Sequence, residues 1–194
     1  MKSTLTNMVL VLLAITAIAS ASVGGVYILT KEPIAIATEN AKKEALSQVL
    51  PTFDQTTMEI VALDGMELEL YTATAAGEVV GYAINTATMS GFSGLFCLMV
   101  GLDTTGKIIN INVLSHNETP GLGSKMTEED NSLLRSVKGK QIKDINWAMS
   151  KNGGDIEALT AATISSVAYA DAVERAMKAF NQVTSNGQKG VSNE

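Results

Sequence analysis

The sequence has almost none of the side chains that build disulfides and metal centres. Its 194 residues include one cysteine, Cys97, and one histidine, His116. A single cysteine excludes an intramolecular disulfide and a cysteine-based metal site, and a single histidine excludes the histidine-rich zinc motifs. Ser93, in the stretch GFSGL, lacks the G-x-S-x-G frame of a nucleophilic serine. We therefore expect no metal site and no catalytic residue of a hydrolase.

Charged side chains are also scarce, at 18% of residues, and the formal net charge is −6. The lysines and arginines are spread along the chain rather than clustered. This distribution argues against a nucleic acid as a partner. Part of the scarcity is local, because no charged side chain lies between Lys2 and Lys31.

The uncharged stretch predicts one transmembrane helix. Its apolar body, residues 8–29, is long enough to cross a hydrocarbon core of about 30 Å. A cleaved signal peptide would have a more basic start and a shorter apolar region, although Ala19-Ser20-Ala21 resembles a cleavage site and keeps that alternative open. A lipoprotein signal would need a cysteine directly after the apolar segment, and the single cysteine is Cys97. A buried core helix of this length would usually have a polar face, which this segment lacks.

The few charges beside this helix predict its orientation. Lys2 and the amino terminus lie on one side, whereas Lys31 and Glu32 cancel on the other. The positive-inside rule then places residues 1–7 in the cytoplasm and the remaining domain outside it. We expect a single-pass protein of the bacterial cytoplasmic membrane.

The rest of the chain predicts an α+β fold, an antiparallel sheet with flanking helices. Helical spacing after Pro33 predicts a juxtamembrane helix that ends at Pro51. This helix and a connector make up residues 30–65. The secondary structure of residues 54–65 is ambiguous from the sequence. Four segments have the pattern of β-strands, either alternating apolar and polar residues or a continuous apolar stretch. Together they predict an antiparallel meander. These segments are residues 66–74, 78–90, 95–103 and 108–115.

Two further helices complete the predicted domain, residues 66–180. The first spans residues 127–137, since Thr127 and Asp130 resemble a capping box. The second spans about residues 165–180. The polar segment 181–194 is predicted to be a flexible tail.

The segment LSHNETPGLGSK, residues 114–125, is one candidate binding segment. Pro120-Gly121 makes a turn, and the glycines expose backbone N–H groups that a flat ligand could approach. The spacing of a phosphate-binding P-loop is absent. An ordinary loop after a strand remains the alternative. A structural or ligand-lining role for His116 is favoured over catalysis in which Glu118 orients it.

A cluster of threonine and serine residues at the start of the last predicted helix is the second candidate binding segment. A helix that begins near Ile164 would direct its free N–H groups and positive dipole end at Thr163, which suits a phosphate group. The alternative is a helix cap with spare serines. The residues concerned are Thr160, Ala161, Ala162, Thr163, Ser165 and Ser166.

These two segments resemble a known family. EALTAAT, residues 157–163, resembles the flavinylation motif Asp-x-x-Ser/Thr-Gly-Ala-Thr, in which the last threonine carries FMN through a phosphoester bond. GLDTTGKIININVLSHNETPGLGSK resembles the FMN-binding domain of the G subunits of Rnf ion-translocating electron-transport complexes, which is related to the C subunit of the sodium-translocating NADH:quinone reductase. The resemblance covers the membrane segment and about residues 81–177.

The resemblance implies a site. Thr163 would carry FMN in a phosphothreonine-type linkage, and Thr160 would lie in the loop that a flavin transferase recognises. Glu157 stands where the motif has Asp, and Ala161 stands where it has Gly, which is tolerable unless that position needs a positive φ. The flavin would be lined by Glu118, Thr119, Gly121, Leu122 and Gly123. The full candidate set adds His116, Ala161, Ala162, Ser165 and Ser166.

The resemblance also implies a function, that of a redox subunit which carries electrons and is not independently catalytic. Its partners would be other membrane and iron–sulfur subunits. Threonine is a poor nucleophile and no base lies beside Thr163 in the sequence, so a separate flavin transferase would attach the cofactor. A membrane-anchored flavin sensor, or an interaction domain without a cofactor, remains an alternative. The membrane helix has no acidic or basic residue and therefore no ion path.

Overall fold

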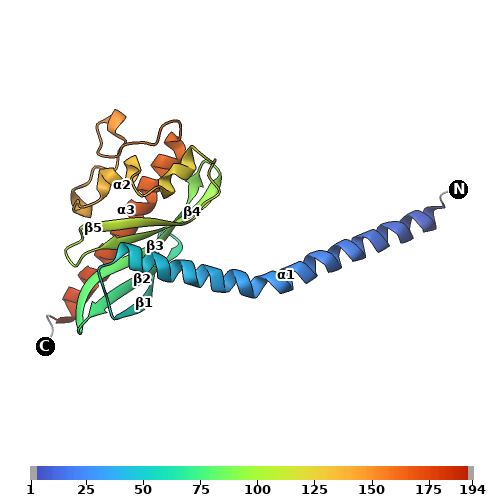
Figure 1. Ribbon diagram of the computed structural model, residues 1–194, viewed down its shortest axis with the longest axis horizontal. Helices are drawn as coiled ribbons and strands as arrows, with labels where there is room; N and C mark the ends of the chain where they lie inside the picture. Colours follow the sequence, from blue (N-terminus) through green and yellow to red (C-terminus); the bar gives the residue numbers. More distant parts are fainter. Residues whose placement is uncertain (1–3, 192–194) are drawn as a thin grey trace. The chain divides into compact units, whose positions relative to one another are not determined.

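The computed structural model describes residues 4–191, with side chains up to Ser185. The chain divides into two compact units, residues 1–41 and the segment from Lys42 onward, and Figure 1 shows its elements. The helices are α1 (Leu5–Val49), α2 (Ser132–Val137) and α3 (Thr163–Val191). The strands are β1 (Gln55–Leu63), β2 (Met66–Ala75), β3 (Glu78–Gly91), β4 (Gly94–Leu102) and β5 (Ile108–Ser115). Short 3₁₀ helices span Gly123–Thr127, Ile142–Asp144 and Ser150–Asn152.

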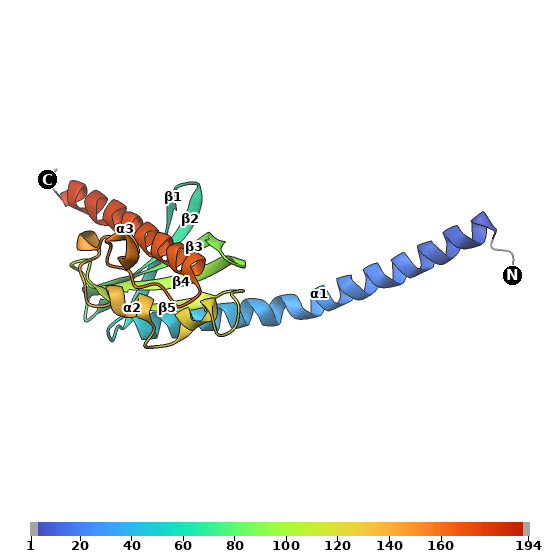
Figure 2. The same cartoon turned by 90° about the horizontal axis from the view of Figure 1, so that it is seen from above.

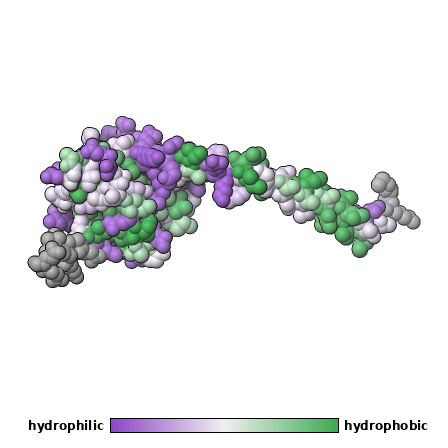
Figure 3. Space-filling model, turned by 90° about the horizontal axis from the view of Figure 1, so that it is seen from below, coloured by the Kyte–Doolittle hydropathy of each residue, from purple (hydrophilic) through white to green (hydrophobic). Residues whose placement is uncertain are grey.

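Helix α1 is continuous, in contrast to the two helices predicted on either side of Pro33. Proline removes one hydrogen bond from a helix interior, yet Pro33 lies inside α1 without ending it. The N-terminal part of α1 is long and apolar enough to cross a membrane. All of its large apolar side chains from Leu5 to Leu29 are more than half exposed, and Figure 3 shows this apolar surface in green. Residues 1–3 of the predicted cytoplasmic segment, including Lys2, lie outside the described residues.

The sheet is an antiparallel meander of order β1-β2-β3-β4-β5. The predicted α+β class with an antiparallel sheet and flanking helices is confirmed. The ambiguous segment 54–65 is strand β1, in which only Val61 is buried. Its sequence was ambiguous because a strand with little buried surface shows little alternation.

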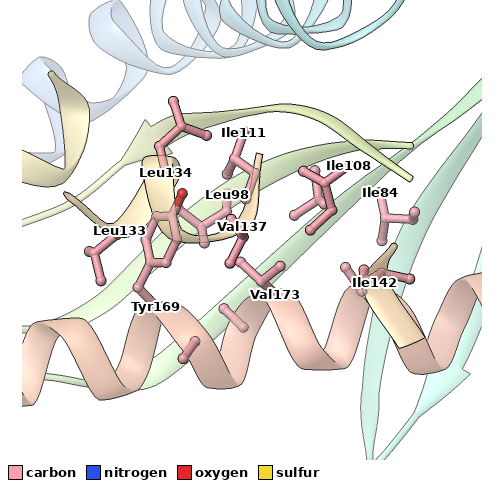
Figure 4. Close-up of a cluster of buried hydrophobic side chains, with 14 of the residues drawn as sticks. Ile84, Leu98, Ile108, Ile111, Leu133, Leu134, Val137, Ile142, Tyr169 and Val173 are labelled. Atoms are coloured by element: carbon pink, nitrogen blue, oxygen red, sulfur yellow. The ribbon is translucent and has the colours of Figure 1, made fainter. Parts of the chain in front are cut away.

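Helix α3 and the last turns of α1 cover opposite faces of the sheet, as Figure 2 shows. Leu98 and Val100 of β4 pack in the α3-side core, whereas Met99 packs in the smaller core with Leu46 and Val49 of α1. This two-sided burial explains the continuous apolar run in β4. Figure 4 shows the larger core, in which side chains of α3, α2 and the sheet meet. Its labelled members are Ile84, Leu98, Ile108, Ile111, Leu133, Leu134, Val137, Ile142, Tyr169 and Val173.

Polar contacts fix α3 along β3. The Thr86 hydroxyl donates to the carbonyl oxygen of Ala172 at 3.0 Å. Arg175 donates to the carbonyl oxygen of Ala87 at 2.6 Å and forms an ion pair with Asp171. These contacts hold the N-terminal half of α3 against the sheet.

The start of α2 differs from the prediction. The helix begins at Ser132, and its cap is Asn131, whose side-chain oxygen accepts from the Leu134 N–H. Thr127 does not cap it, because its hydroxyl donates to the carbonyl oxygen of Ser124. Asn131 also donates to the carbonyl oxygen of Met126, so one asparagine joins the preceding 3₁₀ helix to α2.

Helix α3 is longer than predicted at both ends, since it begins at Thr163 and continues past Phe180 to Val191. The Thr184 hydroxyl donates to the carbonyl oxygen of Phe180, one turn back. Residues 181–191 are therefore helical, and the predicted flexibility of the tail 181–194 stays a prediction. Residues 192–194 lie outside the described residues.

A cluster of four polar side chains joins the end of α1 to the sheet. Glu69 Oε1 lies 2.7 Å from Lys42 Nζ, and Glu69 Oε2 accepts from Tyr71 and Asn85, each at 2.9 Å. Burial acts to raise the pKa of Glu69, but the hydrogen bonds from Lys42, Asn85 and Tyr71 outweigh it, so this pKa lies below its ordinary value of 4.5. The cluster therefore stabilises the fold through an ionised carboxylate.

We expect Glu69→Gln to lower the free energy of unfolding by about 1–2 kcal/mol at pH 7, because a charge-assisted hydrogen bond is lost. The folded-state pKa is depressed, so this contribution is present above pH 4.5 and disappears as the pH falls through the folded-state pKa. Urea unfolding of the full chain in detergent, followed through the single tryptophan, measures it. The exposed Glu67→Gln is the control. A wild-type-to-variant difference that stays constant down to pH 3 would contradict the prediction.

Candidate cofactor site

The N-terminus of α3, the loop after β5 and the hairpin between β3 and β4 meet around a pocket of about 330 Å³. The pocket is lined by Phe92, Glu118, Thr119, Leu122, Gly123, Ala161, Ala162, Thr163, Ile164 and Ser165. Eight of these residues belong to the set predicted from the sequence. The pocket thus joins the two candidate segments, which are about forty residues apart in the sequence.

The first residues of α3 line this pocket, and a helix start has backbone N–H groups without an intrahelical acceptor. The Ser166 N–H donates to the Ala162 carbonyl oxygen at 3.0 Å. The N–H groups that precede it, on Thr163, Ile164 and Ser165, come too early in the helix to have an intrahelical acceptor. The Thr163 side chain is exposed. An exposed threonine therefore lies at the positive end of the helix dipole.

Glu118 is the buried charged group of the pocket, with 4% of its surface exposed. Its Oε2 accepts from the Ser165 hydroxyl at 2.6 Å, and its Oε1 accepts from the Ser93 N–H at 3.1 Å. A buried carboxylate needs such donors. The carboxylate therefore ties the first turn of α3 to the β3–β4 hairpin.

His116 lies outside the pocket lining. Its Nδ1 accepts from the Glu118 backbone N–H at 3.1 Å, so the contact between the two residues runs through the backbone. His116 therefore stabilises the backbone of the loop that carries Glu118.

The two glycines of the loop have different roles. A Cβ on Gly123 would lie 2.6 Å from Glu118 Oε2 and 2.8 Å from Ser165 Oγ, so this glycine leaves room for the Glu118–Ser165 hydrogen bond. Gly121 lies outside the lining, has a φ of +75° and donates its N–H to the Ser124 hydroxyl. Gly121 therefore shapes the turn.

Thr160 and Ser166 also lie outside the lining. Thr160 is exposed. Ser166 is fully buried, donates its hydroxyl to the Ala162 carbonyl oxygen and accepts from the Leu159 N–H. Ser166 therefore fastens the loop before α3.

Sequence reasoning missed two apolar pocket residues, Phe92 and Ile164. They are 67% and 55% exposed, and Leu122 of the same pocket is 40% exposed. Val167, one turn after Ile164, is half exposed as well. Phe92 did carry a signal, because an aromatic residue between glycines at a hairpin tip has no core to enter. Large apolar side chains grouped at the surface mark a binding site.

Ala161 has a left-handed backbone, with a φ of +58°. This conformation costs a residue with a Cβ about 1–2 kcal/mol. The glycine that the similar flavinylation motif has at this position avoids that cost. We expect Ala161→Gly to raise the free energy of unfolding by about 0.5–1 kcal/mol, since the added entropy of the unfolded chain offsets part of the gain.

Thermal unfolding of the full chain would measure this gain. Ala162→Gly is the matched control, because the buried Ala162 is not among the residues with positive φ; we expect it to destabilise the fold. Equal effects from the two substitutions would show that the conformation of Ala161 is not strained.

Comparison with known proteins matches the part of the chain that contains this pocket. The model of the FMN-binding domain family matches residues 91–178, a range that contains the whole pocket lining. Among curated proteins, the chain is similar to the G subunit of the ion-translocating oxidoreductase complex of Shewanella loihica, with 38% identity over 59% of this chain and 55% of that protein. The chain thus spans about half the length of this relative and of the Shewanella oneidensis protein.

Two further G subunits of such complexes match over longer ranges. The protein of Vibrio vulnificus is 32% identical over 79% of this chain and 78% of its own length. That of Aliivibrio fischeri is 34% identical over 88% of this chain and 87% of its own length. These alignments are longer than the range that the family model matches. The chain therefore belongs to the family of G subunits of ion-translocating oxidoreductase complexes.

Proposed function

We propose that this chain is a membrane-anchored flavoprotein subunit of an ion-translocating electron-transport complex, and that it relays electrons through FMN bound to Thr163 by a phosphoester bond. One observation carries the proposal: an exposed threonine, Thr163, is the first residue of α3 and lines the pocket. Helix N-termini suit phosphate groups. The names of the relatives support the membership of a complex.

The chemistry of the lining supports a covalent attachment. No lysine or arginine is among the residues that line the pocket, so a free phosphate would have only backbone N–H groups and hydroxyls as partners. The buried Glu118 carboxylate would repel a phosphate placed close to it. A bond to Thr163 Oγ1 would hold the phosphate at the helix end without a cationic side chain.

The other lining residues would bind and shield the cofactor. FMN, when bound, supplies one- and two-electron redox chemistry. Glu118 would accept hydrogen bonds from hydroxyl or N–H groups of the cofactor, since an ionised carboxylate can accept hydrogen bonds but cannot donate them. Phe92, Leu122 and Ile164 would cover a flat ring and exclude water from it. Thr119, Ala161, Ala162 and Ser165 would surround the chain that links ring and phosphate.

The location and partners follow from the same proposal. Helix α1 would anchor the chain in the bacterial cytoplasmic membrane, with the amino terminus in the cytoplasm and the flavin domain on the extracytoplasmic side. The tether would prevent loss of the cofactor there. A flavin transferase would attach it, and other membrane and iron–sulfur subunits would exchange electrons with it.

The experiment that tests this function is purification of the tagged full chain from its own membranes in mild detergent. We expect flavin absorbance to elute with a multi-subunit complex, to bleach on reduction and return on reoxidation, and to stay with the chain after denaturation. A flavin-bearing chain that elutes alone would indicate a membrane-anchored sensor. A chain without flavin, in cells with an active transferase, would overturn the proposal.

A further inference from the structure

A long part of the chain has no basic side chain. Between Lys43 and Lys107, which includes all of β1 to β4, there is no lysine, arginine or histidine. The same stretch holds eight acidic residues, of which Glu69 is paired with Lys42. Five others are exposed on or beside β1, β2 and β3 and have no ion-pair partner among the described residues. They are Asp54, Glu59, Asp64, Glu67 and Glu78.

Strand β1 is also an open edge of the sheet. Among residues 4–191 it pairs only with β2, over nine residues in an uninterrupted register, and Figure 1 shows it at the end of the sheet. The opposite edge is partly covered, because Ile108 of β5 exchanges backbone hydrogen bonds with Lys140 and Gly139. Proteins usually protect free edges with lysine, proline or a bulge. Strand β1 has none of these features.

The edge carries apolar side chains that the fold leaves exposed. Met58 and Ile60 are 55% and 52% exposed, and because they are two residues apart they lie on the same face of the strand. Glu59, between them, points to the opposite face. The side chains that a neighbouring strand would meet are therefore apolar on one face and acidic on the other.

We propose that β1 binds an extended segment of another subunit as an added strand, and that this segment alternates apolar and basic side chains. Its backbone would use the free hydrogen-bonding groups of β1. Its apolar residues would lie beside Met58 and Ile60, and a lysine or arginine would lie across from Glu59. The inference rests on the proposed function in so far as the partner belongs to the same complex.

Charge decides against a second copy of this chain as the occupant. Antiparallel pairing of two β1 strands would bring their exposed carboxylates together, and like charges placed across a sheet are destabilising. Nothing basic on the described part of these strands could compensate. A partner segment with basic residues removes this repulsion and gains attraction from the surrounding acidic side chains.

Hydrogen–deuterium exchange tests the added strand directly. Peptides that cover residues 55–63 are compared between the detergent-solubilised full chain alone and the purified complex. We expect exchange in the complex to be slower by about tenfold or more, because outward-facing amides gain acceptors. Equal exchange rates in the two samples would overturn the inference.

Two variants test the chemistry of the partner. We expect the double variant Glu59→Lys/Ile60→Lys to reduce recovery of the other subunits about fivefold to tenfold. Glu67→Lys/Val79→Lys is the matched control, since it makes the same change of three charges at exposed positions of β2 and β3, away from the free edge, and should have a smaller effect. Equal losses from both would indicate general electrostatic attraction and overturn strand addition.

The outcomes separate the two proposals. A flavin-bearing chain that purifies with other subunits, but whose β1 stays unprotected, overturns the inference and leaves the proposed function standing. A chain that purifies without any other subunit overturns both. Unchanged tryptophan fluorescence and unfolding temperature in the variants establish that the losses do not come from unfolding.

Discussion

Replacing Thr163 by alanine is expected to remove all covalently bound flavin while leaving the chain folded. The phosphoester needs the side-chain oxygen of Thr163, and alanine has none. The side chain is exposed, so the substitution should change the free energy of unfolding by only about 0.5 kcal/mol or less. The measurement is flavin fluorescence of the denatured chain on a gel, after expression of wild type and variant with a flavin transferase.

Two controls accompany this variant. Thr163→Ser retains a hydroxyl at the same helix position and should retain fluorescence. Thr57→Ala removes an exposed threonine of β1 and should not change it. Fluorescence that persists in Thr163→Ala would move the attachment to another residue. If the wild-type band shows no flavin fluorescence while another substrate of the same transferase does, then Glu157 and Ala161 prevent the modification.

Gly101→Ala is expected to be the most destabilising of the small substitutions that we consider. A Cβ at this position would overlap the Val49 carbonyl oxygen and lie 2.7 Å from Val49 Cβ. The obstacle is backbone, so no rotamer change can relieve the overlap. Overpacking of this kind costs about 1–3 kcal/mol or more. We expect a loss of about 2–3 kcal/mol, as the end of α1 shifts away from β4.

Thermal unfolding of the full chain in detergent would show this loss as a fall of about 5–10 °C. Ala62→Val is the control, since it adds bulk to an exposed position of the same sheet and should be nearly neutral. An unfolding temperature within about 2 °C of wild type would imply that α1 and β4 are not packed so closely.

The parts of the fold that sequence reasoning found are those with a local signal. Alternation predicts the strands β2 and β5, and the continuous apolar run predicts the strand β4. Strand β1 lacked such a signal because only Val61 is buried. Thr127 was predicted to start the helix because Thr127 and Asp130 resemble a capping box, whereas the contacts of the actual cap, Asn131, with the preceding 3₁₀ helix exist only in the fold.

In the candidate site, too, sequence reasoning found the features with a local signal and missed those that depend on the fold. Loop glycines and a hydroxyl-rich helix start are local features, so both segments were found. Their contact was not, because the hydrogen bond between Glu118 and Ser165 joins residues 47 positions apart. The need for Gly123 follows from that contact. Phe92 reaches the pocket only because the β3–β4 hairpin brings it there.

The absence of basic residues from Lys43 to Lys107 also determines how this protein responds to common reagents. Trypsin cuts after lysine and arginine, so β1 to β4 remain together in a single fragment, residues 44–107. Amine-reactive cross-linkers need a lysine and therefore cannot mark the surface of these strands. A contact map made with such reagents would be blank over most of the sheet even if a partner covered it. Pepsin digestion, or cross-linking through carboxylates, would report on this surface instead.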